Sequence, residues 1–120
     1  MNYTKAQIAE DVLRKLGLLE ANSSGSATDV AYIARVYDQA SGEWADDGLV
    51  YWPNTGLTVA EIPAAVASIL CDLLANRVQA AFGTPISVTD MQDMEERILR
   101  RLRRHCAHRL SGFTTKVDTF

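Results

Sequence analysis

Apolar residues recur every three or four positions along most of the chain, which is the period of an α-helix rather than of a β-strand. The first apolar stripe consists of Ile8, Ala9, Val12, Leu13 and Leu16. Thr4 followed by Gln7 has the capping-box spacing of a helix start, and Gly17 suits the left-handed residue that ends a helix. The pattern predicts a helix over residues 3–16, followed by a small polar loop.

Two further helices follow the same period. The second stripe consists of Val30, Ile33, Ala34, Tyr37 and Trp44. It predicts a helix from residue 28 or 29 to about residue 45, before Gly48. A third helix, over residues 61–82, is apolar around so wide an arc that we expect it to lie centrally in the domain. Between these helices, "LVYWPNTGLTV" places β-prone residues on both sides of good turn chemistry, which predicts a small hairpin or an ordered loop.

A fourth helix completes the predicted domain. Thr89 and Gln92 repeat the capping-box spacing, and the helix is expected to run to about Leu110. The remaining segment, "SGFTTKVDTF", is polar and small, which predicts an extended C-terminal arm over residues 111–120. The fold class is therefore all-α: a four-helix bundle-like domain over residues 1–110, with the hairpin or ordered loop between helices two and three and the arm at the end.

Both tryptophans of the chain lie in "EWADDGLVYW", residues 43–52, where the second helix ends. Trp44 follows Tyr37 by seven residues and therefore shares its helix face. We expect Trp44 to close one end of the bundle, with the following loop folded over it. The members of this stretch that can still lie at the surface are Asp46, Asp47 and Trp52.

The composition of the chain restricts the classes of protein to which it can belong. The 120 residues, 48% apolar and 22% charged, suit one globular domain. No apolar run reaches 18 residues without a charge, so no membrane span is expected, and no membrane is predicted among the partners. Cys71 and Cys106 lie in helical patterns and are expected to be reduced thiols. The chain has no Gly-rich phosphate loop and no nucleophile elbow, and "RRHCAHRL" points its histidines in different directions on a helix. The sequence therefore predicts no enzyme and no catalytic, cofactor-binding or metal-binding residues.

Charge divides the chain into two unequal parts. Residues 1–96 carry 5 Lys and Arg against 14 Asp and Glu, a net charge of −9, whereas residues 97–120 carry 7 against 1, a net charge of +6. Arg101, Arg103 and Arg104 have no acid three or four residues away on either side. Three interpretations stay open for them: a solvated face, a surface for nucleic-acid phosphates, and a docking surface for an acidic face of another subunit.

The order of these signals resembles the head-to-tail adaptor (connector) proteins of tailed bacteriophages. The signals are "VLRKLGLL" at the end of the first helix, a polar loop, a second helix ending in "EW" with acids and "GL", and then "IPAAVASILCDLLANRVQAAFG". The resemblance covers about residues 4–83. The most similar group is the tail accessory factors, or packaged-DNA stabilisation proteins, of short-tailed phages.

The resemblance implies a structural protein of the virion neck, made in the host cytoplasm. Such adaptors form a ring, typically of twelve copies, beneath the portal protein. The ring extends the channel for the genomic double-stranded DNA, helps to retain packaged DNA, and docks the tail or nozzle protein. Family members often have a C-terminal arm that reaches the portal or a neighbouring subunit, and here that position is occupied by a segment containing Phe113, Val117 and Phe120.

A ring of this kind and the uneven charge together predict an interface. A closed ring uses two different patches of each subunit, so a basic face can meet an acidic face of the next copy. The basic candidates are Arg101, Arg103 and Arg104, and the acidic candidates are Glu43, Asp46 and Asp47. The alternative function is a small helical DNA-binding regulator that uses the Arg-rich fourth helix, although the 14 acids before residue 97 would repel DNA over most of its surface.

Overall fold

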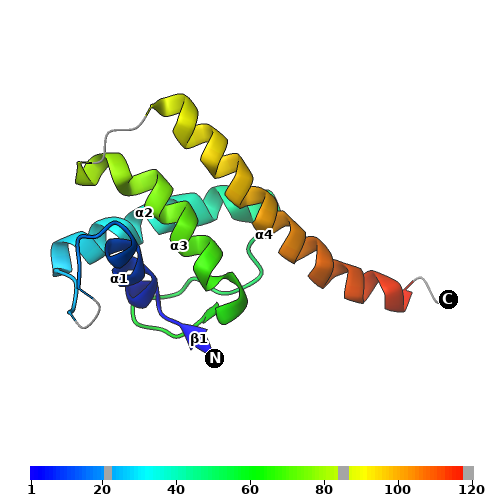
Figure 1. Ribbon diagram of the computed structural model, residues 1–120. Coiled ribbons are helices and arrows are strands. Elements are labelled where there is room, and N and C mark those ends of the chain that lie inside the picture. Colours follow the sequence, from blue (N-terminus) through cyan, green and yellow to red (C-terminus); the bar gives the residue numbers. More distant parts are fainter. Residues whose placement is uncertain (21–22, 84–86, 118–120) are drawn as a thin grey trace.

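The computed structural model describes residues 1–20, 23–83 and 87–117, with side chains described as far as Ala107 in the last helix. Four α-helices make up most of the chain: α1 (Lys5–Lys15), α2 (Ala27–Asp46), α3 (Ala64–Val78) and α4 (Val88–Val117). A short 3-10 helix, η1 (Gln79–Phe82), extends α3, and two-residue strands, β1 (Asn2–Tyr3) and β2 (Ile62–Pro63), lie before α1 and α3. The predicted all-α, four-helix fold is confirmed (Figure 1).

Local sequence signals set most helix ends. The Thr4 hydroxyl accepts a 3.0 Å hydrogen bond from the Gln7 N–H, and the Gln7 side chain accepts a 2.9 Å bond from the Thr4 N–H, so the predicted capping box is present. Gly17 has a φ of 77°, as its helix-ending position requires. The second predicted box is wrong: Ser87, rather than Thr89, caps α4, because its hydroxyl accepts a 3.1 Å bond from the Asp90 N–H.

The segment between α2 and α3 is an ordered loop and not a hairpin. Its only strand among the described residues, β2, pairs antiparallel with β1 at the N-terminus, with Tyr3 opposite Ile62. The Glu61 carboxylate ties the loop together by accepting bonds from the N–H and hydroxyl of Thr55, at 2.6 and 2.7 Å. The Leu57 carbonyl accepts a 3.1 Å bond from the Ala6 N–H, which fastens the loop to α1.

The core surrounds α3, as its wide apolar arc predicts. This helix packs against α1, α2 and α4. Leu70 and Leu73 of α3 and Leu102 of α4 are fully buried, and so is Trp44 at the end of α2. By length and composition alone, residues Ala64–Phe82 could cross a membrane, but half of that window is buried inside the domain. A central core helix of a globular domain accounts for this composition equally well.

The C-terminal segment departs from the prediction, because α4 continues through Ser111 to Val117 instead of giving way to an extended arm. A formed helix adds residues at little cost, and this segment has no proline to stop it, so Gly112 alone does not end it. At about 1.5 Å per residue, α4 is about 45 Å long. Its last turns pass beyond the other helices (Figure 1), and the long axis of the molecule is 54 Å against 34 and 23 Å for the others.

Candidate functional site: the arginine face of α4 and the groove beside α2

The outer face of α4 carries a line of arginines. Arg97, Arg100 and Arg104 are exposed and follow the i, i+3, i+7 spacing that places residues on one side of a helix. Leu102 and Cys106, on the opposite side, are buried against the domain. Within the described part of the chain, none of these three arginines forms an ion pair. We call Arg97, Arg100 and Arg104 the arginine face.

Arg101 is not part of this face, although the sequence groups it with Arg103 and Arg104. Its guanidinium lies 2.7 Å from the Asp72 carboxylate of α3, and the Lys15 ammonium of α1 lies 2.7 Å from the other oxygen of the same carboxylate. Burial alone would raise the pKa of Asp72, but hydrogen bonds from both cations and their charges hold that pKa below its ordinary value. The Asp72 cluster therefore joins three helices within one molecule.

Of the remaining charged candidates, Glu43 and Arg103 have ion-pair partners within the molecule, whereas Arg104 has none among the described residues. Glu43 already has a partner in the chain, because Arg77 reaches it at 2.8 Å and reaches Glu95 of α4 at 2.6 Å. Arg103 lies 3.8 Å from Glu96, and both side chains are largely exposed, so this pair contributes little. Arg104 has no ion-pair partner in the described part of the chain, and it stays available for an external partner.

Asp46 and Asp47 lie at the end of α2 and are exposed, as the surface interpretation requires. No ion pair within residues 1–20, 23–83 and 87–107 involves either of them. The chain turns at Gly48 immediately after them, and the Cys106 thiol of α4 donates a hydrogen bond of 3.3 Å to the Leu49 carbonyl. Leu49, two residues after Asp47, therefore lies against α4 on the side of Cys106.

Trp52 is buried, with 6% of its surface exposed, so a surface position for it is wrong. Its indole N–H donates a 2.8 Å hydrogen bond to the Tyr37 hydroxyl of α2. The neighbouring Tyr51 hydroxyl lies 2.7 Å from His105 Nε2 of α4. The aromatic stretch thus does close one end of the bundle, and it also fastens the loop to both α2 and α4.

Of the three apolar residues expected to make a C-terminal contact, two lie in the described helix and one lies outside the described residues. Phe113 and Val117 lie in the part of α4 whose backbone alone is described, so they belong to a helix instead of an extended arm. Phe120 lies outside the described residues.

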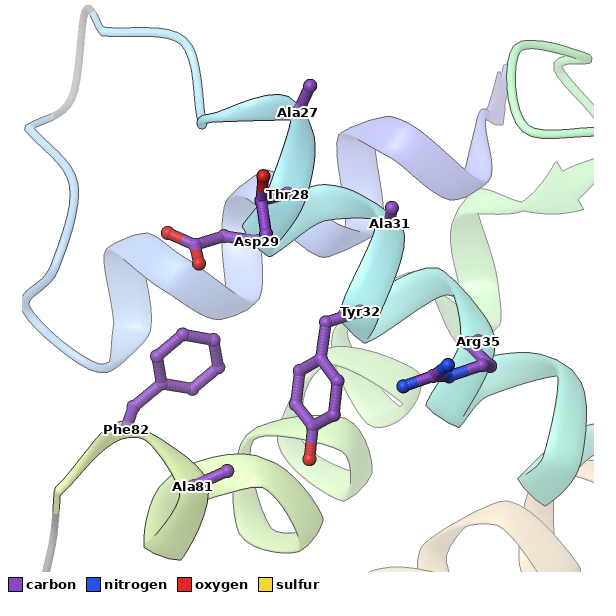
Figure 2. A pocket seen from close by; sticks show the side chains of 8 residues that line it. All are labelled: Ala27, Thr28, Asp29, Ala31, Tyr32, Arg35, Ala81 and Phe82. Carbon is purple, nitrogen blue, oxygen red and sulfur yellow. The ribbon is translucent and has the colours of Figure 1, made fainter.

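An open groove of about 870 Å³ lies between the first turns of α2 and η1 (Figure 2). The rings of Tyr32 and Phe82 meet edge to face in it, with 5.9 Å between their centroids. The Arg35 guanidinium lies 5.9 Å from the Tyr32 ring, and Asp29 lies one helical turn before Tyr32. The lining residues are Ala27, Thr28, Asp29, Ala31, Tyr32, Arg35, Ala81 and Phe82. We call this the α2–η1 groove.

The sequence pattern missed this groove for a physical reason. Tyr32 and Phe82 lie off the core stripes, 50 residues apart in the chain, and only the packing of α3 on α2 brings them together. The sequence contains one signal for the groove. A large aromatic residue, Tyr32, precedes Ile33 of the α2 core stripe and lies on a helix face outside that stripe.

A second groove, of about 420 Å³, lies between α1, α3 and the first half of α4. Its charged lining includes Lys15, Asp72 and Arg101, which satisfy one another, and the amide of Asn76 donates a 2.9 Å bond to the Met91 carbonyl. By contrast, neither Asp29 nor Arg35 in the α2–η1 groove has an ion-pair partner in the described part of the chain. The α2–η1 groove is therefore the better candidate for docking.

Among the described residues, no group of three or more His, Cys, Asp or Glu side chains lies close enough together to hold a metal ion. Comparison with known proteins gives no further guide: no protein-family model, no curated protein and no solved structure matches the chain. Its function must be inferred from these surfaces and from the order of its sequence signals.

Proposed function

We propose that the chain is a structural protein of a tailed-phage virion: a head-to-tail adaptor that forms a ring of twelve copies beneath the portal. The observation that carries this proposal is the form of α4. This helix projects beyond the body of the molecule (Figure 1). Its last two thirds, residues 97–117, carry 7 cations and no acid. A projecting helix of one sign of charge on an otherwise acidic chain favours a partner outside the chain.

The ring form of the proposal rests on the presence of two patches of unlike charge. Ring-forming contacts are heterologous, meaning that one patch meets a different patch on the next copy. The chain offers the arginine face of α4 and the exposed acids Asp46 and Asp47 as patches of opposite charge without described partners. Because Arg101 and Glu43 have partners within the molecule, the proposed charged interface reduces to Arg103 and Arg104 with Asp46 and Asp47.

The proposed ring surrounds the exit path of the genome, and its wall decides how DNA moves. A densely basic wall would bind duplex phosphates tightly and slow ejection, since duplex DNA carries one charge per about 1.7 Å of axis. We propose a channel lined mainly by acidic and neutral side chains, with the arginine face turned toward protein. The side chains nearest the ring axis in an image of the assembled particle decide this point.

The test is assembly on the cognate portal protein. Size-exclusion chromatography and electron microscopy, with the full chain alone and mixed with the portal at physiological salt, would measure it. A portal-dependent ring is the expected result. A chain that stays monomeric and never associates with the portal would overturn the proposal.

A second function is favoured by one specific observation: Arg97, Arg100 and Arg104, spaced i, i+3, i+7 on the exposed side of α4, form no ion pair within the described residues. They suit the phosphates of nucleic acid, as in a small DNA-binding regulator. Fluorescence anisotropy with short duplexes of different sequence, at several salt concentrations, separates the two functions. Sequence-dependent binding without portal association would favour the regulator, whereas weak, sequence-independent binding that disappears with salt would leave the adaptor as the function.

A further inference from the structure

We infer that the projecting C-terminal turns of α4 from one copy occupy the α2–η1 groove of the next copy. The inference rests on the proposed ring and deepens it by naming the contact between neighbours. It commits the groove to one occupant, residues 108–117 of a second molecule.

The first step is the placement of the two features. The groove lies at η1 and the first turns of α2, and the end of α4 leaves the body on the other side of the molecule (Figure 1). A copy therefore cannot fill its own groove with its own helix end. Two unlike patches at opposite ends of one molecule produce head-to-tail contacts, which close into a ring when the rotation between copies allows it.

The second step is the apolar match. In the sequence of the helix end, Leu110, Phe113 and Val117 follow the i, i+3, i+7 spacing of a single helix face. This is the anchor spacing of helices that bind in grooves. The α2–η1 groove offers the rings of Tyr32 and Phe82 and small residues, Ala31 and Ala81, that leave room for large side chains.

The third step is charge. Residues 108–117 include Arg109 and Lys116 and no acid. The groove has Asp29 at one end and Arg35 at the other, six residues apart on α2 or about 9 Å along its axis. A helix that enters with Arg109 beside Asp29 gains an ion pair there, and one that enters in the opposite direction gains the equivalent pair with Lys116, so an acid in the groove meets a cation of the segment in either case. The cations at both ends of the segment allow either direction of the incoming helix along α2.

Cysteine cross-linking tests this contact in the assembled ring. Ala31→Cys places a thiol in the groove, and Thr114→Cys places one on the helix end without removing Phe113. The native thiols interfere little, because Cys71 is half-buried with a pKa raised by burial to about 11, and Cys106 is buried. A mixture of the two variants on the portal should give a disulfide-linked dimer under mild oxidation. Replacing Ala31→Cys by Ala65→Cys should not, because Ala65 is exposed in the first turn of α3, at the end remote from η1.

A blocking variant provides a second measurement. Ala31→Glu puts a charge into the groove at an exposed helical position, and it should raise the protein concentration needed for ring formation about ten-fold or more while the helix content stays unchanged. Ala65→Glu is the matched control and should assemble normally.

The outcomes separate the inference from the function on which it rests. Rings that form without the 31–114 cross-link, or that form normally with Ala31→Glu, would overturn the groove contact and leave the adaptor intact. Loss of portal binding by Ala31→Glu, with no 31–114 cross-link between copies, would assign the groove to the portal and also overturn the groove contact. If no ring forms with the unmodified chain, the proposed function and the groove contact both fail.

Discussion

The indole of Trp52 donates its N–H to the hydroxyl of Tyr37, 2.8 Å away, and both side chains are buried. The bond crosses from the loop after α2 back to the middle of that helix. It satisfies a donor and an acceptor that would otherwise be enclosed without partners. Burial, the largest cause, raises the pKa of Tyr37 above its ordinary value, whereas the bond from Trp52 acts in the opposite direction.

Removing the Tyr37 hydroxyl should destabilise the domain. Tyr37→Phe keeps the ring but leaves the Trp52 N–H buried without an acceptor, which costs about 1–3 kcal/mol of unfolding free energy. Urea unfolding followed by tryptophan fluorescence measures the loss. Tyr32→Phe is the control, because the Tyr32 hydroxyl has no hydrogen bond within the described residues, and its stability should stay within about 0.5 kcal/mol of the parent. Equal losses for both variants would contradict a role for the Trp52–Tyr37 bond.

Replacing Asp72 should have an effect that depends on pH. The two cations hold the pKa of this carboxyl below its ordinary value, so the charged form stabilises the folded state. That stability is present above the pKa of an unfolded Asp, about 3.9, and is lost as pH falls through the lower folded pKa. Asp72→Asn should therefore cost up to about 1 kcal/mol near pH 7, since Lys15 and Arg101 are about half exposed, and much less near pH 2. Urea unfolding at both pH values tests this, and an equal cost at both would count against the cluster.

The features that were predicted correctly from the sequence are those that depend on residues close together in the chain. The capping box at Thr4 and the helix-ending Gly17 each follow from residues within a few positions, and the burial of Trp44 follows from its helical spacing to Tyr37. These features need only the 3.6-residue period and the requirements of helix ends.

The features that escaped prediction depend on contacts between distant segments. The buried Trp52 N–H has its acceptor in the hydroxyl of Tyr37, 15 residues earlier, and Arg101 is paired because α3 brings Asp72 to it from 29 residues away. A search for acids three or four positions away cannot detect such partners. At the C-terminus, the polar character of the segment after Leu110 suggested an arm, but helix propagation from α4 outweighs it.

Reversing single arginines should separate stability from assembly. Arg101→Glu removes a partner of Asp72 and places a like charge beside it, so it should lower the unfolding free energy by about 1 kcal/mol. Arg104→Glu changes an exposed residue with no ion pair in the described chain, and should leave stability within about 0.5 kcal/mol while weakening assembly on the portal. Unfolding and portal-binding measurements on both variants are required. Normal assembly by Arg104→Glu at physiological salt would remove Arg104 from the interface.

Removing the helix end should abolish assembly but not folding. A chain that stops at Leu110 loses residues 111–120. The last turns of α4, up to Val117, pass beyond the other helices (Figure 1), so we expect the core to form without them. We expect a folded monomer whose unfolding free energy lies within about 1 kcal/mol of the full chain. It should fail to form the portal-dependent ring, since the proposed anchors Phe113 and Val117 are absent.

A shorter deletion provides the control for that truncation. A chain that ends at Val117 lacks only residues 118–120 and keeps all of α4, so it should assemble if the helix itself makes the contact. Sedimentation velocity of both truncations with the portal measures assembly, and circular dichroism checks that the helices remain. If the chain that stops at Leu110 joins the particle as well as the full chain, the projecting helix is dispensable. If the chain that stops at Val117 also fails, the contact depends on Phe120 or its neighbours instead of on the helix, because the loss of three terminal residues leaves every described helix in place.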